Sequence, residues 1–506
     1  MTQEFEITEA TVADVHDAYE AGTLTCRELV DRYLERIEAY DRDGPEFNAV
    51  VTVNPHATER AEELDAAFES EGLVGPLHGI PVAIKDQVET AEVRTTFGSE
   101  AFADYQPAAD ATLVRKLREA GAIVLAKTNL PDWATSWFGY SSVLGRTKNP
   151  YALDRDPGGS SSGTGAAVAA NLATVGIGED TGGSIRLPAA YTNLFGIRVT
   201  PGLLSRTGMS PLVVSQDTPG PMTRTVTDLA TVLDVAVGYD PADEYTAVTE
   251  FVEGVSYADA LDSDSLAGAR IGVLRGAFGD PDDPDSGPVT RLVDEAIETM
   301  AEAGAAIVDP VEIPSLDEHV ERTSLYIAQS KRDLNDFFAA REDAPVGSVE
   351  ELYESGQYHE ILDLLIGIAE EGPEDPESDP DYWERVAAQM SFQRAVLTVY
   401  ADHDLDVLLC PDVQVVPPTA ASIEAGELDT LTFPTNTVIA SQSGCCAVSM
   451  PAGLTDEGLP VGVELIGKPY DEVTLVGFAY AYEQLTNHRR SPETAPGLEN
   501  RTGDKA

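Results

Sequence analysis

The stretch from Asp156 to Pro188 constrains the fold of this chain more than any other. It holds two clusters of small residues, DPGGSSSG at 156–163 and DTGGS at 180–184, with an apolar, alanine-rich run at 166–177 between them. Clusters of glycine and serine are common in linkers, but a linker is not joined to an apolar run that must be buried. The pattern therefore predicts two buried functional loops.

The two clusters suit a site that stabilises a negative charge. Glycine lets the backbone approach a ligand closely, and consecutive N–H groups in such a turn can converge on one developing charge, which Ser184 would also face. A phosphate-binding loop is the alternative. However, the chain lacks G-x-x-x-x-G-K-[ST], and Gly176-x-Gly178 precedes Gly182 with one residue too many for G-x-G-x-x-G. Nucleotide binding is therefore disfavoured.

A candidate base lies upstream of the two clusters. Lys85 ends a short apolar segment at 80–86, which is typical of a buried strand. A lysine at the end of a strand is usually a solvated charge, but this chain contains only seven lysines. If Lys85, Ser160 and Ser184 converge, a neutral lysine could activate one serine through the other. The N–H groups of 181–184 would then form an oxyanion hole.

Histidine is the rival base. The chain has seven histidines, but Ser184 does not lie in a G-x-S-x-G turn, and no histidine lies in a loop with other evident catalytic groups. His78 is close to Lys85 in sequence, and we expect it to be a structural turn residue. Lysine therefore remains the favoured base.

Charge is the main departure from an average composition. The 506 residues include 88 acidic and 32 basic side chains, which gives a formal net charge of −56. The acidic residues are spread along the chain, so we expect adaptation to a salt-rich cytosol rather than an acidic tail. Such a surface would repel phosphates, which argues against nucleic acid as a direct partner.

Other sequence features indicate a cytoplasmic protein. The four cysteines have neither C-x-x-C nor metal-finger spacing, which indicates reduced thiols. The N-terminus is acidic and lacks the order of a signal peptide, and no run of eighteen apolar residues predicts a membrane span. We therefore expect a cytoplasmic location and no membrane partner.

Helical and strand patterns alternate along the chain, which is typical of a sheet with helices on its faces. Capping boxes begin predicted helices at Thr11 and Thr25. Further helices are predicted at 55–70, 110–120, 226–237 and 471–487, and strands at 122–127, 195–199, 269–274, 305–308, 406–410, 446–450 and 461–466. The segment 216–222 is predicted to be a loop, 314–401 a polar helical cover without chemistry of its own, and the chain beyond Arg490 poorly ordered.

Three motifs resemble those of the amidase signature family. They are GIPVAIKD at 79–86, GGSS at 158–161 and DTGGSIR at 180–186, and the likeness extends to 127–129, 216–221 and 458–462. The resemblance implies that Ser184 is the acylated nucleophile, Ser160 a bridging serine in a cis-peptide position and Lys85 the base. It also implies that Asp180 and Arg186 brace the oxyanion loop, which is formed by Thr181, Gly182, Gly183 and Ser184. Two positions depart from the family pattern, namely Ser162 and Thr164.

The resemblance also implies a fold. The family fold is α/β, with a single large mixed sheet sandwiched between helices. We expect one domain over 1–490, followed by a tail at 491–506. Within the domain we expect N-terminal helices at 1–70, a catalytic core at 71–240, a variable helical cover at 280–440 and a C-terminal part of the core at 441–490.

The implied activity is hydrolysis of a linear carboxamide through an acyl-enzyme, on a small-molecule amide and without metal or cofactor. A homodimer is one alternative for the oligomeric state. The alternative is the glutamine-hydrolysing (glutaminase) subunit of a tRNA-dependent amidotransferase, which works within a complex. The loop at 216–219 and the C-terminal sequence look more like those of stand-alone amidases.

Overall fold

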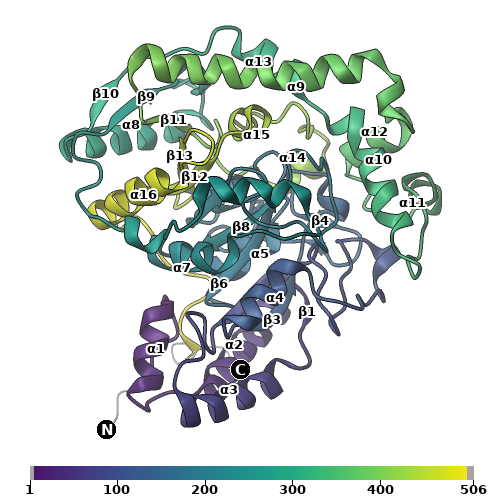
Figure 1. The fold of residues 1–506 in the computed structure, drawn as a ribbon, viewed down its shortest axis with the longest axis vertical. Helices are drawn as coiled ribbons and strands as arrows, with labels where there is room; N and C mark the ends of the chain where they lie inside the picture. Colours follow the sequence, from purple (N-terminus) through teal and green to yellow (C-terminus); the bar gives the residue numbers. More distant parts are fainter. Residues whose placement is uncertain (1–4, 499–506) are drawn as a thin grey trace.

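A mixed sheet of eleven strands runs through the computed structural model, which describes residues 5–498, and helices flank the sheet on both faces (Figure 1). The strand order is β1-β3-β2-β6-β8-β7-β12-β13-β11-β9-β10. The strands are β1 (Val50–Val53), β2 (Pro81–Lys85), β3 (Ile123–Thr128), β6 (Val175–Asp180), β7 (Phe195–Arg198), β8 (Thr218–Thr223), β9 (Arg270–Val273), β10 (Ala306–Val308), β11 (Val407–Pro411), β12 (Ala447–Leu454) and β13 (Pro460–Ile466). A separate hairpin joins β4 (Tyr140–Ser141) to β5 (Gly145–Arg146). The predicted fold class is confirmed.

The helices follow the predicted alternation with the strands. They are α1 (Val12–Glu20), α2 (Cys26–Arg36), α3 (Ala57–Glu71), α4 (Thr112–Glu119), α5 (Ser162–Ala169), α6 (Arg186–Tyr191), α7 (Val226–Ala236), α8 (Gly287–Glu302), α9 (Leu316–Thr323), α10 (Tyr326–Ala339), α11 (Val349–Ser355), α12 (Asp363–Glu371), α13 (Pro380–His403), α14 (Ala420–Glu424), α15 (Val438–Ser443) and α16 (Glu472–Thr486). Both predicted capping boxes are present, at Thr11 and Thr25. Within residues 5–498, no helix is both long and apolar enough to cross a membrane.

Parallel pairing brings Lys85 and the second cluster to one edge of the sheet. β2 runs parallel to β6, with Ile84 opposite Ile177, so the carboxyl ends of the two strands carry Lys85 and Glu179 to the same place. The run at 166–177 begins in α5, whose first residue, Ser162, belongs to the first cluster, and ends in β6, whose last residue, Asp180, begins the second. The apolar run is therefore the buried link that fixes the two clusters relative to each other.

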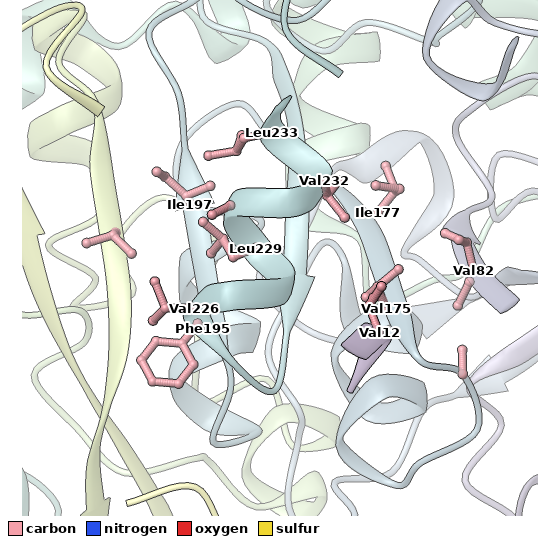
Figure 2. Packing of buried hydrophobic residues seen from close by; sticks show 14 of the residues in the cluster. Val12, Val82, Val175, Ile177, Phe195, Ile197, Val226, Leu229, Val232 and Leu233 are labelled. Atoms are coloured by element: carbon pink, nitrogen blue, oxygen red, sulfur yellow. The ribbon is translucent and has the colours of Figure 1, made fainter. Parts of the chain in front are cut away.

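The main hydrophobic core lies between the sheet and its helices. Figure 2 shows one part of it, where Leu229 and Leu233 of α7 lie beside Ile197 of β7, and Val175 and Ile177 of β6 belong to the same cluster. All five side chains are fully or almost fully buried. Burying aliphatic side chains of this size contributes about 1.5–3 kcal/mol each, so this layer holds the central strands rigidly in place.

One predicted loop is a central strand. We expected a loop at 216–222, but Thr218–Thr223 forms β8, between β6 and β7. The prediction was wrong because proline usually argues against a central strand. Here β7 pairs with β8 only at Met222 and Thr223, so Pro219 and Pro221 have no strand partner on that side.

The chain beyond Arg490 is ordered at its beginning. Arg36 of α2 donates hydrogen bonds to the carbonyl groups of Ala495 and Pro496, and Ala495 is fully buried. The predicted poor order is therefore wrong for 491–498, because a buried arginine needs these carbonyl acceptors. The remainder of the predicted tail, 499–506, lies outside the described residues.

The helices α9 to α13 gather at one end of the molecule, opposite α1 to α3 (Figure 1). The helices α10 to α13 share a second hydrophobic cluster with loops of the segment 71–240, in which Tyr326, Leu334 and Phe338 pack with Phe97 and Trp133. This packing supports the predicted role as a cover. It also places one side chain of the cover, Tyr326, at the site.

Candidate active site

Lys85 and Ser160 meet in the interior. Neither side chain is exposed, and Lys85 Nζ lies 2.8 Å from Ser160 Oγ. The same nitrogen lies 3.2 Å from the carbonyl oxygen of Glu179 and 3.2 Å from its carboxyl Oε2. Burial lowers the pKa of Lys85 below its usual value, although Glu179 acts in the opposite direction. A lowered pKa is what a lysine base requires.

Ser160 lies in the first cluster, just before α5. The peptide bond between Gly159 and Ser160 is cis, as the family resemblance implied. The N–H of Ser161 donates to the carbonyl of Ser184 at 3.1 Å, so this bond joins the two clusters. Gly158 has a φ of +80°, and a Cβ there would collide with Leu187. The glycines thus let the two turns pack against each other.

The second cluster presents four backbone donors. In the described part of the chain, none of the N–H groups of 181–184 donates a hydrogen bond to another protein group. Gly183 has a φ of +145°, a conformation that side chains rarely adopt. A Cβ at Gly182 would collide with the Tyr326 hydroxyl, and one at Gly183 with Thr437. Free N–H groups in a tightly packed turn are suited to bind an oxyanion.

A buried network of ion pairs holds this turn in place. Asp180 accepts hydrogen bonds from the Ile185 N–H at 3.1 Å, from Arg186 at 3.1 Å and from Arg198 at 2.9 Å. Burial acts to raise the pKa of Asp180, but the two arginines outweigh it and hold that pKa at about 2. Arg186 also binds Glu464 on β13 at 2.7 Å. The predicted bracing contacts of Asp180 and Arg186 are therefore present.

The two departures from the family pattern, Ser162 and Thr164, bond to groups other than Ser160 and Ser184. Ser162 Oγ donates to the Asn129 carbonyl at 3.4 Å, and Thr164 Oγ1 lies 2.7 Å from Thr128 Oγ1. Both contacts are with β3 or the loop that follows it. Neither side chain intervenes between Ser160 and Ser184.

A hollow of about 650 Å³ opens over Ser184, whose exposed fraction is 4%. Its apolar wall includes Trp137, Leu212, Tyr326, Ile327, Phe433 and Ile439. Exposed acidic side chains line its outer part, namely Asp317, Glu321, Glu371, Asp379 and Asp381, and one arginine, Arg385. Ser184 and Thr181 line the hollow, whereas Lys85 and Ser160 do not. The arrangement can therefore admit a substrate to the serine while it keeps the lysine away from water.

Sequence reasoning missed three residues at this site. Glu179 contacts Lys85, Tyr326 comes from the helical cover, and Thr437 precedes α15. Glu179 could have been suspected because it adjoins the second cluster, but nothing in the sequence pairs the cover with that cluster. The rival base His78 is buried and lies 3.7 Å from the sulfur of Cys26, among α1 and α2.

The four cysteines of the described residues are free, and all four are buried. Within residues 5–498, no group of three or more His, Cys, Asp or Glu side chains is placed to hold a metal ion.

Known proteins resemble this chain over nearly its whole length. The family model described as Amidase matches residues 28–476. A glutamyl-tRNA(Gln) amidotransferase subunit from Geobacter metallireducens is 35% identical, over 95% of this chain and 98% of its own length. The crystal structure of the peptide amidase from Stenotrophomonas maltophilia is 37% identical, with a TM-score of 0.86 over 97% of this chain and all of the other. The corresponding amidotransferase subunit from Thermotoga maritima is 26% identical, with a TM-score of 0.76 over 97% and 98% of the two chains.

Proposed function

The chain belongs to the amidase family, whose members act on amide C–N bonds, and we propose that it is a stand-alone amidase with a Lys85–Ser160–Ser184 triad. The observation that carries the proposal is the 2.8 Å contact between Lys85 and Ser160, both buried, next to a turn with free N–H donors. A serine hydroxyl is a weak nucleophile, and this arrangement provides a base for it and a site for the charge that forms.

In the proposed reaction Ser184 attacks the carbonyl carbon of the amide. Its proton passes to Ser160, and the proton of Ser160 passes to Lys85. The N–H groups of 181–184 hold the oxyanion. When the C–N bond breaks, Lys85 returns the proton through Ser160 to the leaving amine or ammonia. Water then hydrolyses the acyl-enzyme by the same route, and the three side chains are restored.

The substrate is proposed to be a linear amide with an apolar group near the carbonyl. The supporting observation is that Trp137, Leu212 and Tyr326 line the same hollow as Ser184. The peptide amidase that resembles this chain adds peptide amides to the candidates. Release of ammonia or amine from aliphatic, aryl and C-terminal peptide amides, measured in high salt, would rank these classes.

A fluorophosphonate probe tests the nucleophile directly. We expect the wild-type protein to be labelled at Ser184, and Ser184→Ala to lose both labelling and amidase activity while its circular dichroism in molar salt is unchanged. Ser162→Ala is the matched control, because Ser162 contacts the Asn129 carbonyl instead, and it should still be labelled. Labelling of Ser184→Ala at the wild-type level would refute the assignment.

A second candidate function is the glutamine-hydrolysing subunit of an amidotransferase. The observation in its favour is the 35% identity to an amidotransferase subunit over nearly the whole chain. We prefer the stand-alone amidase because the structural likeness to the peptide amidase is greater than that to the Thermotoga protein. Glutaminase activity that appears only with a co-purified partner would favour the second function.

A further inference from the structure

Glu179 is a buried acid beside Lys85 that the proposed reaction does not use. Its side chain is not exposed, and its Oε2 lies 3.2 Å from Lys85 Nζ. A carboxylate at this distance favours the charged form of lysine, whereas a base must be neutral. An ion pair here would therefore oppose the proposed reaction.

We propose that Glu179 is a positioning residue that holds the proton of Lys85, so that the resting pair is a neutral amine beside a neutral carboxylic acid. The inference rests on the proposed function. Compared with the ion pair, the neutral pair has one N–H bond fewer on Lys85 and one O–H bond more on Glu179 Oε1, so the number of protons and the total charge are unchanged. During the reaction Lys85 takes up and returns the proton of Ser184, while Glu179 keeps its own.

The contacts around Lys85 Nζ match a neutral amine. Two of its three neighbours, the carbonyl and Oε2 of Glu179, can accept the two N–H bonds of an amine. The third, Ser160 at 2.8 Å, is a hydroxyl, which can donate its hydrogen to the remaining lone pair. That is the orientation from which Ser160 gives its proton to Lys85.

The contacts on the other oxygen of Glu179 match a carboxylic acid. Thr181 Oγ1 lies 2.6 Å from Asp217 Oδ1 and 3.0 Å from Glu179 Oε1. A hydroxyl carries a single hydrogen, and the shorter contact is with Asp217, which also accepts N–H bonds from Leu212 and Val213. The contact between Thr181 and Glu179 is then completed by a hydrogen on Glu179 Oε1.

Burial favours the neutral pair. Moving two charged groups out of water costs several kcal/mol per ion, and their mutual attraction does not always compensate for this desolvation. Burial raises the pKa of Glu179 to about 7, with Lys85 opposing the shift and Asp217 and Asp180 adding to it. Burial also lowers the pKa of Lys85. Both shifts favour the uncharged forms.

The charged and titratable groups around Glu179 come from several elements. Lys85 belongs to β2, Asp180 to β6, Asp217 precedes β8, Arg198 belongs to β7 and Tyr326 to α10. Arg198 is already bound to Asp180 at 2.9 Å, so its charge is neutralised by that carboxylate. The remaining acid, Asp217, repels a second negative charge and therefore favours a proton on Glu179.

A second hollow of about 280 Å³ has Glu179 and Asp217 in its wall, together with Arg206 and Asp333. It shares no lining residue with the hollow over Ser184. Glu179 therefore lies between the two hollows: it contributes to the wall of the second, and its Oε1 contacts Thr181, which lines the first.

Infrared difference spectroscopy tests the charge state. In molar salt at about pH 6, below the pKa of about 7, subtracting the spectrum of Glu179→Gln from that of wild type should leave a carboxylic-acid C=O band. The band should fade as the pH is raised through 7. Glu179→Thr removes the same carboxyl and should give the same band if Glu179→Gln does not fold. Carboxylate bands in place of the acid band would overturn the proposal.

The pH dependence of acylation gives a second readout. The acid limb is the fall in the rate of fluorophosphonate labelling as the pH is lowered. If the pair is neutral, Lys85 faces an uncharged group in wild type and in Glu179→Gln, so the acid limb should lie at nearly the same pH in both. If the pair is ionic, the substitution should move that limb to lower pH by about 1–3 units, which would contradict the proposal. Glu472→Gln, a buried acid on α16 bound to Thr200, is the matched control and should leave the limb in place.

The two proposals fail separately. Wild-type protein labelled at Ser184, with carboxylate bands from Glu179, would refute only the neutral pair. Wild-type protein that is not labelled at Ser184 would refute the proposed triad, whatever the charge of Glu179.

Discussion

Lys85 and Lys127 lie on neighbouring strands and are equally buried, yet their contacts suit different charge states. β2 and β3 run parallel, with Lys85 opposite Thr128 and Lys127 opposite Ile84. Neither lysine is exposed, and burial lowers the pKa of both. Each also has a buried carboxyl group nearby, Glu179 at 3.2 Å and Asp86 at 2.9 Å respectively.

The difference lies in the third partner. Lys127 Nζ is surrounded by Asp86 Oδ1, the Val88 carbonyl at 2.7 Å and Thr95 Oγ1 at 2.9 Å. The Thr95 hydroxyl donates to the Val93 carbonyl at 3.4 Å, so it and the Val88 carbonyl accept hydrogen bonds from Lys127, while Asp86 Oδ1 forms an ion pair with it. These partners suit a charged ammonium. Lys85 instead has two acceptors and the Ser160 hydroxyl. The hydrogen-bonding partners, rather than burial alone, distinguish a structural cation from a base.

We expect the largest effect from the removal of salt, because it should unfold the protein and so disrupt the surroundings of both lysines. With a formal charge of −56, the chain repels itself when salt is withdrawn, because the screening length grows from a few ångströms to tens of ångströms. We expect the protein to lose structure between molar and low salt, along with all labelling of Ser184. Circular dichroism that is unchanged over this range would contradict the expectation.

Substitution of the base should remove activity but not the fold. Lys85→Met should lower kcat/KM by at least about ten thousandfold, because Ser160 then has no proton acceptor. Stability should change little, since Glu179 can remain as a neutral acid. Thermal unfolding in molar salt and amide hydrolysis would be measured together. Near-wild-type hydrolysis by folded Lys85→Met would exclude the lysine base.

The same substitution at the other lysine should have the opposite result. Lys127→Met leaves Asp86 buried without its cation, and breaking such a pair costs about 3–5 kcal/mol. Denaturant unfolding in molar salt should show this loss, while the folded fraction should still be labelled at Ser184. If Lys127→Met abolished labelling without loss of stability, the two lysines would not differ in the way that we infer.

A smaller effect is expected at Thr95. Thr95→Val removes one acceptor from the Lys127 ammonium and leaves a buried N–H unsatisfied, at a cost of about 1–3 kcal/mol. Thr95→Ser keeps the hydroxyl and is the control. Urea titrations of the three proteins provide the comparison. Equal stability of Thr95→Val and wild type would argue that Lys127 does not need the Thr95 hydroxyl as an acceptor.

Much of the site could be predicted from sequence because its residues are neighbours along the chain. The turn from Asp180 to Arg186 carries the proposed nucleophile, its backbone donors and the Asp180–Arg186 ion pair within seven positions. Glycine is required there because a Cβ would collide with neighbouring side chains. Lys85 could be added because it ends an apolar strand. The strand β8 was not predicted because proline usually argues against a central strand. The sequence does not show that β7 pairs with β8 only at Met222 and Thr223, away from the prolines.

The sequence by itself determined the α/β class, the family and the residues of the proposed triad, because strand periodicity, glycine turns and motif spacing are local properties. The tertiary structure alone decided which groups meet across the sheet. It placed Tyr326 of α10 against Gly182, and it surrounded Lys85 and Lys127 with different partners. The charge of a buried lysine depends on every group that faces it, and those groups come from segments far apart in the chain.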